Sequence, residues 1–180
     1  IRDLVRSRGL GDVYKRQTLD SAANAVNVSG NWEVAASGAF ISTGRVTFNA
    51  GSGTVIIEPG GTDGNHDFHH VVFDDSAGTA LFRLAGDVVA NGDFTVTNGM
   101  VDTTASNYGI TAGGNYTQAA GAQVKANASV ITVTGDFSAD GSADDADPVA
   151  YPASVVSAYY NNAAIDMAGT ASTVSYTHLT

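Results

Sequence analysis

The sequence predicts an all-β fold that stacks one short unit repeatedly, a β-solenoid with turns of about 21 residues. The main observation is a phrase of Gly, then Asn or Asp, then an aromatic residue, which occurs in "SGNWEV", "NGDFTV", "GGNYTQ" and "TGDFSA". Its glycines, Gly30, Gly92, Gly114 and Gly135, are separated by 62, 22 and 21 positions. Because 62 is close to three times 21, one period accounts for all four copies, and such a period is typical of stacked repeats.

Apolar residues hold fixed places around each glycine. The aliphatic pairs before it are Val26/Val28, Val88/Ala90, Ile110/Ala112 and Ile131/Val133, and the rings after it are Trp32, Phe94, Tyr116 and Phe137. All these positions share one parity, so in an extended strand they project from the same face. We expect successive turns to bury that face, with ring over ring.

The glycine and the residue after it have separate expected roles. The missing side chain permits a bend in the strand or a close approach of the backbone. The residues after the glycines point the other way, and in a stack they form a polar ladder or cap turns. These residues are Asn31, Asp93, Asn115 and Asp136.

The remaining sequence favours strands over helices. "RVTFNA", "GTVIIEP", "HVVFDD" and "ALFRLAGDVV" are β-branched and aromatic runs, and clusters such as "NAGSG", "GGTDGN" and "DSAGT" close them. Residues 152–167 allow either a short helix, with a proline at its start, or one more irregular strand turn. The alternative fold is a β-sandwich, but its strands need not share a phrase at this spacing.

The two ends of the chain differ from the rest. Five of the eight basic residues fall in positions 1–17, and "GDVYKRQ" and "VSYTHL" resemble translated sequencing-adaptor sequence. We expect 1–17 and 174–180 to be non-native tails outside the core, against the alternative of a genuine basic linker or helix. The solenoid is expected over 18–147, with an irregular continuation or cap over 148–173, as a fragment open at both ends.

Charge limits the classes of partner. Residues 18–173 hold sixteen acidic and three basic residues, a net charge of −13, so the clustered Lys and Arg of a nucleic-acid or anionic-lipid surface are missing. There is no cysteine, and no apolar run approaches the ~20 residues that span a bilayer. We therefore expect no nucleic acid partner and no membrane insertion, and an extracellular setting fits this acidic composition.

The repeats resemble those of large secreted bacterial surface proteins of the filamentous-haemagglutinin-like and autotransporter-like kind. The similarity rests on "SGNWEVAASGAFISTGRVTFNAGSGTV" and "LAGDVVANGDFTVTNGMVDT" and covers most of residues 25–140. It implies a right-handed parallel β-helix at the cell surface or secreted, a non-enzymatic adhesive or structural spacer module. Carbohydrate, a host or neighbouring cell surface and adjoining repeats are the implied partners. The alternative is a fragment of a carbohydrate-active β-helix enzyme, a polysaccharide lyase or glycoside hydrolase.

Two clusters contain metal-ligand residue types. His66, His69 and His70 with Asp63 and Asp67 suit a divalent ion, although a polar turn before a strand explains the same pattern. The second cluster gives a calcium hypothesis, against the alternative of a solvated acidic turn. Its residues are Asp140, Asp144, Asp145 and Asp147.

Catalytic and cofactor motifs are weak. The adjacent carboxylate pairs Asp74/Asp75 and Asp144/Asp145 would point to opposite faces of a strand, which does not suit acid and base on one sugar. The sequence therefore predicts no catalytic residues and no cofactor other than Ca²⁺.

Overall fold

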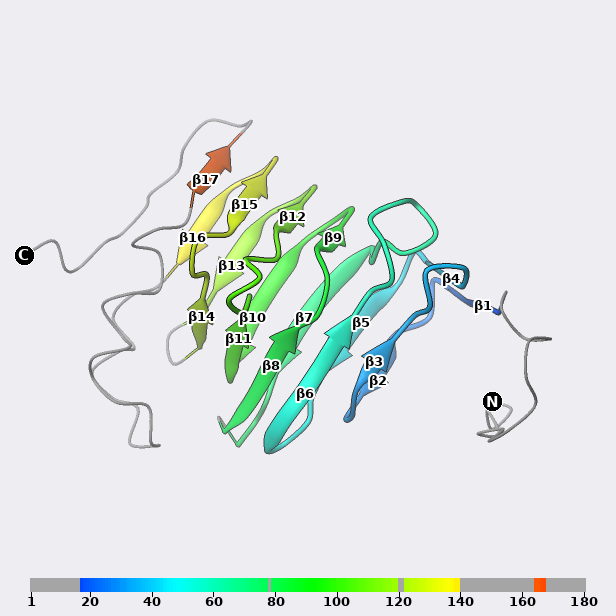
Figure 1. Cartoon of the computed structure of the whole chain (residues 1–180), viewed down its shortest axis with the longest axis horizontal. Helices are drawn as coiled ribbons and strands as arrows, with labels where there is room; N and C mark the ends of the chain where they lie inside the picture. Colours follow the sequence, from blue (N-terminus) through cyan, green and yellow to red (C-terminus); the bar gives the residue numbers. More distant parts are fainter. Residues whose placement is uncertain (1–16, 78, 120–121, 140–163, 168–180) are drawn as a thin grey trace, which may run out of the picture.

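The strands of the chain stack side by side along one long axis. The structure is a computed structural model and describes residues 17–77, 79–119, 122–139 and 164–167. Along this axis successive turns follow the order of the sequence, from β1 (Thr18–Ala22) with β4 (Ala39–Ser42) beside it at one end to β16 (Phe137–Ala139) and β17 (Ala164–Met167) at the other (Figure 1). Every strand pair between the described strands is parallel.

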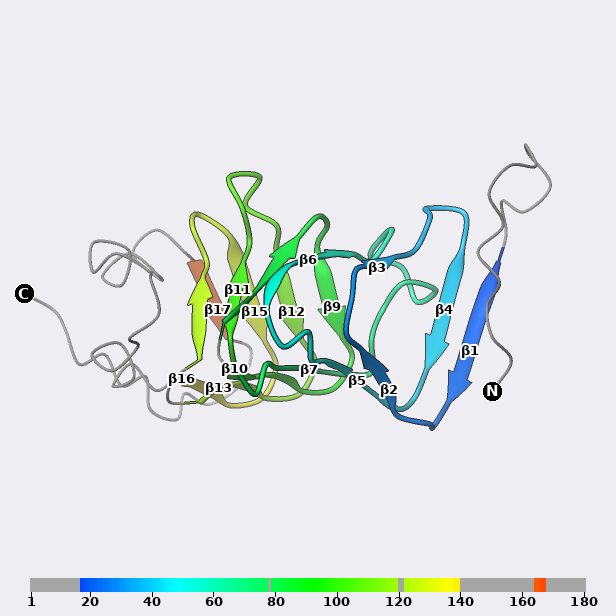
Figure 2. The same cartoon turned by 90° about the horizontal axis from the view of Figure 1, so that it is seen from below.

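Three sheets form the sides of the stack, and a fourth, small sheet lies at its N-terminal end (Figure 2). The six-stranded sheet has the order β16 (Phe137–Ala139), β13 (Tyr116–Gln118), β10 (Phe94–Asn98), β7 (His70–Asp74), β5 (Arg45–Phe48) and β2 (Val26–Val28). The five-stranded sheet has the order β14 (Gln123–Lys125), β11 (Met100–Asp102), β8 (Ala80–Leu84), β6 (Gly53–Glu58) and β3 (Trp32–Glu33). The four-stranded sheet is β17 (Ala164–Met167), β15 (Val130–Val133), β12 (Ile110–Ala112) and β9 (Val88–Ala90), and the two-stranded sheet pairs β1 (Thr18–Ala22) with β4 (Ala39–Ser42).

The chain visits these sheets cyclically, which makes it a β-solenoid of about five turns. One inward row of the six-stranded sheet has residues separated by 20, 25, 23, 22 and 21 positions, an average of about 22 per turn. The residues of this row are Val26, Val46, Val71, Phe94, Tyr116 and Phe137. The parallel pairing confirms the predicted solenoid over the β-sandwich, and the described residues contain no helix.

Three copies of the repeated phrase occupy equivalent places. Phe94, Tyr116 and Phe137 pair in register across β10, β13 and β16, and each is at most 1% exposed. The aliphatic pairs before them lie in β9, β12 and β15 of the four-stranded sheet. The phrase therefore crosses a corner between two sheets, and its glycine lies at the bend instead of inside one straight strand.

The first copy does not belong to this row, which corrects the four-copy alignment. Trp32 lies in β3 and pairs with Ile57 of the five-stranded sheet, while Val26 and Val28 lie in β2 of the six-stranded sheet. An aliphatic strand, a Gly-Asn bend and an inward ring suit any corner of a three-sided turn. The wide gap between the first copy and the second therefore does not represent three repeats of the same corner.

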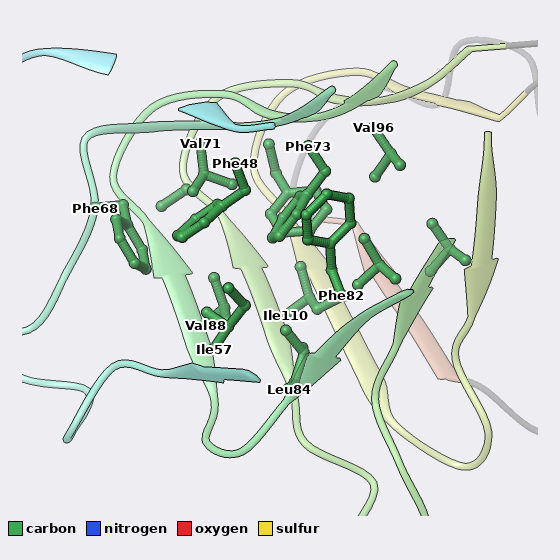
Figure 3. Close-up of a cluster of buried hydrophobic side chains, with 14 of the residues drawn as sticks. Phe48, Ile57, Phe68, Val71, Phe73, Phe82, Leu84, Val88, Val96 and Ile110 are labelled. Carbon is green, nitrogen blue, oxygen red and sulfur yellow. The ribbon is translucent and has the colours of Figure 1, made fainter. Parts of the chain in front are cut away.

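The core fills the space between the sheets with aliphatic and aromatic side chains (Figure 3). Phe48, Phe73 and Phe82 lie together in its centre, and Phe68 lies at one side, near Phe48. All four are fully buried. Burial of each such ring contributes roughly 1.5–3 kcal/mol relative to leaving it in water, and stacking contacts add to this.

Several expectations concern residues outside the described part of the chain. These are residues 1–16, the tail 174–180 and most of 148–173. Gln17, at the border of the first tail, accepts a backbone hydrogen bond from Ala39 at 2.8 Å. Residues 164–167 form β17, an edge strand of the four-stranded sheet, and residues 152–163, the rest of the stretch for which a helix or a strand turn was expected, lie outside the described part. No helix capable of spanning a membrane occurs among the described residues.

Candidate functional site

A row of polar residues follows one corner of the six-stranded sheet. Strand register places these residues on successive strands, immediately before or at the start of each strand. We call them the polar row: Arg45, His70, Asp93, Asn115 and Asp136. Because neighbouring strands lie about 4.8 Å apart, the row is a regularly spaced line of side chains on the surface.

Hydrogen bonds between consecutive turns link four members of the polar row, from His70 to Asp136. The Asp93 backbone N–H donates to His70 Nδ1, the Asn115 N–H to Asp93 Oδ1, and the Asp136 N–H to Asn115 Oδ1, each at 2.9 Å. The predicted polar ladder is therefore confirmed for Asp93, Asn115 and Asp136. Asn31 makes the same kind of bond at its own corner, where its Oδ1 accepts from the Ile56 N–H at 2.9 Å.

The glycines of the three equivalent corners leave room for this ladder. A Cβ on Gly92 would lie 2.5 Å from His70 Cε1, and one on Gly114 would lie 2.5 Å from Asp93 Oδ1. A Cβ on Gly135 would likewise collide with Asn115 Oδ1. At Gly30, by contrast, nothing lies within 4 Å. The repeated phrase is thus explained by close approach of one turn to the next at three of its four copies.

A groove open to solvent lies at the N-terminal end of the polar row. It has a volume of about 460 Å³ and lies where the link between β1 and β2 passes beside β5, β7 and β10. Its polar lining residues are Arg45, His70, Asp93 and Thr95, and its apolar lining includes Ala23, Ala25 and Val72. The groove is shallow and largely open, so a ligand bound in it would stay partly exposed to water.

Two neighbouring groups in this groove are hydrogen-bond donors. His70 Nδ1 accepts the Asp93 N–H, so the neutral imidazole carries its proton on Nε2. The same Nδ1 lies 3.4 Å from Asp93 Oδ2, a contact that is an ion pair only when the ring is protonated. Arg45, opposite His70 on the adjacent strand, is exposed and has no carboxylate partner within the described residues.

The histidine cluster predicted as a metal candidate is mainly a structural turn. His66 is 4% exposed and its Nδ1 lies 2.7 Å from Asp63 Oδ1, whereas His70 starts β7 and belongs to the groove. His69 packs edge-on against His70. In the described part of the chain, no three His, Asp or Glu side chains gather as a metal site would require.

The two aspartates of this loop have opposite pKa shifts. A hydrogen bond from the Asn65 backbone, followed by the contact with His66, lowers the pKa of Asp63. Burial raises the pKa of Asp67, against a smaller opposing effect of the hydrogen bond from Asn91 Nδ2. Asp67 Oδ1 is buried and has no hydrogen-bond partner among the described residues.

The pair Asp74/Asp75 is divided between two structural roles. Asp75 is fully buried, and its carboxylate accepts the backbone N–H groups of Ala77, Thr79 and Ala80, which closes the turn between β7 and β8. Asp74 Oδ1 accepts from Asn98 Nδ2 of the next turn at 3.1 Å. The two carboxylates thus do not converge on a common point. Asp140, Asp144, Asp145 and Asp147, the predicted calcium ligands, lie outside the described residues, and the calcium hypothesis stays a prediction.

Sequence reasoning overlooked Arg45 and Thr95. Arg45 opens the run "RVTFNA" and is one of three basic residues between positions 18 and 173, which was a usable signal. Thr95 carried no signal, because threonine is common on exposed strand positions.

Comparison with known proteins gives no match. No protein-family model fits this sequence, and neither a curated protein nor a solved structure is significantly similar to it. The assignment as a β-solenoid therefore rests on strand pairing.

Proposed function

We propose that this chain is a section of an extracellular or cell-surface repeat protein, in which it acts as a non-enzymatic adhesive or structural spacer module. The observation that carries the proposal is the continuous parallel pairing of successive turns around one buried core. Each added turn lengthens such a stack by about 4.8 Å without a change in its cross-section. This architecture suits a rod that holds other groups at a distance.

Two further observations support a surface role. The whole chain has a net charge of −10, which favours solubility and disfavours anionic partners such as nucleic acid. The repeats also resemble those of filamentous-haemagglutinin-like and autotransporter-like surface proteins. Carbohydrate or the surface of another cell is the partner that we propose for the adhesive role.

Surface display tests the proposal. The full chain is displayed on bacterial cells between an anchor and a peptide epitope, and antibody-coated beads report whether the epitope lies beyond the cell's own polysaccharide layer. Attachment of the same cells to immobilised polysaccharide is measured in parallel. We expect the chain to increase bead capture or attachment over the same anchor and epitope displayed in equal amount without the chain between them.

The contrary results are specific. Equal capture and equal attachment for cells with the chain and for cells that display only the anchor and the epitope would refute the spacer and adhesive roles. Release of shortened saccharide from a polysaccharide incubated with the purified chain would refute the non-enzymatic part.

A further inference from the structure

The groove at the N-terminal end of the polar row combines donors, an acceptor and an apolar floor in a small space. We propose that it binds a carboxylate that also carries hydroxyl groups, the chemistry of a sugar acid, with Arg45 as the anchor. The proposal deepens the adhesive role and rests on it, because it gives that role a ligand class.

The first step concerns Arg45. A guanidinium presents a planar fork of donors that matches the two oxygens of a carboxylate. Of the other described basic residues, Arg83 has a nearby carboxylate on its own sheet, Asp102 Oδ2 at 3.9 Å. Arg45 has no such partner in the described part of the chain, although acidic residues far outnumber basic ones. Its charge is thus available to an anion that enters the groove.

The second step concerns His70. Its tautomer is set by the hydrogen bond that Nδ1 accepts from the Asp93 backbone, so Nε2–H is a donor. His70 pairs with Arg45 across β5 and β7, so the two donors lie on adjacent strands about 4.8 Å apart at their backbones. Two neighbouring donors suit the two oxygens of one carboxylate better than they suit a neutral hydroxyl.

The third step concerns the other end of the groove. Asp93 Oδ2 accepts hydrogen bonds, while Oδ1 is held by Asn115, and the Thr95 hydroxyl both donates and accepts. Asp93 would repel a second negative charge, but it would accept hydroxyl hydrogens. Asp93 lies two strands from Arg45, about 10 Å at the backbone. The groove therefore distinguishes an anionic end of the ligand from a hydroxylated end.

The fourth step concerns the floor. Val72 is half-buried between the strands of Thr47 and Thr95, and Ala23 and Ala25 form the side wall. Such a surface packs against the C–H groups of a sugar ring without competing for its hydroxyls. The polar and apolar parts together select a hydroxylated carboxylate over a simple anion.

Titration of the ¹⁵N-labelled full chain with sodium glucuronate tests the proposal by NMR. We expect saturable shifts of signals from Arg45, His70 and Thr95, and at least tenfold weaker binding of glucose, which lacks the carboxylate. Arg45→Gln should weaken glucuronate binding at least tenfold. Arg83→Gln, which removes the same charge from the five-stranded sheet, should leave binding unchanged.

Several results would overturn the proposal. Absence of saturable shifts would refute the site, and an equal effect of Arg83→Gln would reduce it to general electrostatic attraction. Glucose binding as strongly as glucuronate would refute the role of Arg45, and inorganic phosphate binding as strongly would refute the role of the hydroxyl contacts. Cells that display the chain without attaching to polysaccharide, although the purified chain binds glucuronate, would refute the adhesive role alone.

Discussion

The N-terminal and C-terminal turns of this solenoid bury aromatic rings in different ways. Near the N-terminus, four rings form a cluster, three of them from different strands and one from a loop. Their centroids lie 4.8–6.1 Å apart and their planes meet at 49–88°. These rings are Trp32, Phe40, Phe48 and Phe68. Near the C-terminus, Phe94, Tyr116 and Phe137 form a row with centroids 5.3 and 4.8 Å apart and planes within 8° of parallel.

The difference follows from strand register, that is, from whether the rings occupy paired positions on neighbouring strands. Phe94, Tyr116 and Phe137 occupy paired positions of β10, β13 and β16, so each ring lies over the ring before it. The N-terminal turns are uneven, because the turn from Val46 to Val71 is longer than the one before it and contains a loop over residues 59–69 in place of a strand. Phe68 at the end of that loop makes only an isolated bridge to Ala90. Rings at paired positions of neighbouring strands thus stack in a row, as Phe48 and Phe73 also do at 17° across this longer turn, whereas rings from different sides of the stack and from a loop form a cluster.

Removal of one ring from each region tests this comparison and should give the largest effect. Phe94→Ala should reduce the free energy of unfolding by about 3–5 kcal/mol, because the backbones of three paired strands prevent the cavity from closing. Phe68→Ala should cost less, since the cluster contains a loop that can move inward. Urea unfolding followed by circular dichroism measures both. A loss below about 0.5 kcal/mol for Phe94→Ala, the size expected at the surface, would contradict its placement.

Glycine substitution sharpens the comparison at the corners. Gly114→Ala should cost about 1–3 kcal/mol, because its Cβ would displace Asp93 Oδ1 from the Asn115 N–H. Gly30→Ala is the matched control from the first copy of the phrase, and it should lie within about 0.5 kcal/mol of wild type. Thermal melting of the two variants decides the point. Equal losses of stability in the two variants would mean that the corners at Gly30 and Gly114 are equivalent.

The polar ladder should contribute less than the rings and glycines. Asn115→Ala removes the acceptor for the Asp136 N–H and should cost about 1 kcal/mol, while Asn115→Asp keeps an acceptor oxygen and should recover most of it. Asn31→Ala removes the equivalent acceptor for Ile56 at the first corner and should cost about as much. Chemical unfolding of the three variants gives the values. An unchanged free energy of unfolding for Asn115→Ala would show that water replaces the ladder bond.

The smallest expected effect is a pH dependence confined to the loop over residues 59–69. Because burial raises the pKa of Asp67, its carboxyl group binds a proton more tightly in the folded state than in the unfolded state. The contribution of Asp67 to stability is therefore greatest below about pH 3.8 and declines as pH rises through the folded pKa. Asp67→Asn should therefore raise the melting temperature slightly at pH 7 relative to wild type, and not at pH 3.

Asp63 on the same loop provides the opposite case. Its pKa is lowered, so the stabilisation of the fold by the Asp63 carboxylate is present above about pH 3.8 and is lost as pH falls through the folded pKa. Asp63→Asn should lower the melting temperature at pH 7 and have no effect at pH 2. Identical pH profiles for the two variants would contradict the assigned causes.

The regular turns could be predicted from the sequence, and the irregular ones could not. Period and parity identified the stacked rings of Phe94, Tyr116 and Phe137, since each equivalent corner contains the same residues. Trp32 was misplaced because local composition does not tell one corner of a three-sided turn from another. The groove was not foreseen, because its polar residues lie on three different turns at unequal intervals and come together only once the turn lengths are known.

The ladder bonds also give the rod a chemical direction. At the three joints from His70 to Asp136, the earlier turn supplies the side-chain acceptor and the later turn supplies the backbone donor. A completed turn therefore presents a template of oxygen and nitrogen lone pairs to the segment that follows it in the chain. Each such contact involves only nearest neighbours, as in other one-dimensional arrays. At these three joints, growth of the fold from earlier toward later residues would meet side-chain acceptors already in place, whereas growth in reverse would meet backbone N–H donors.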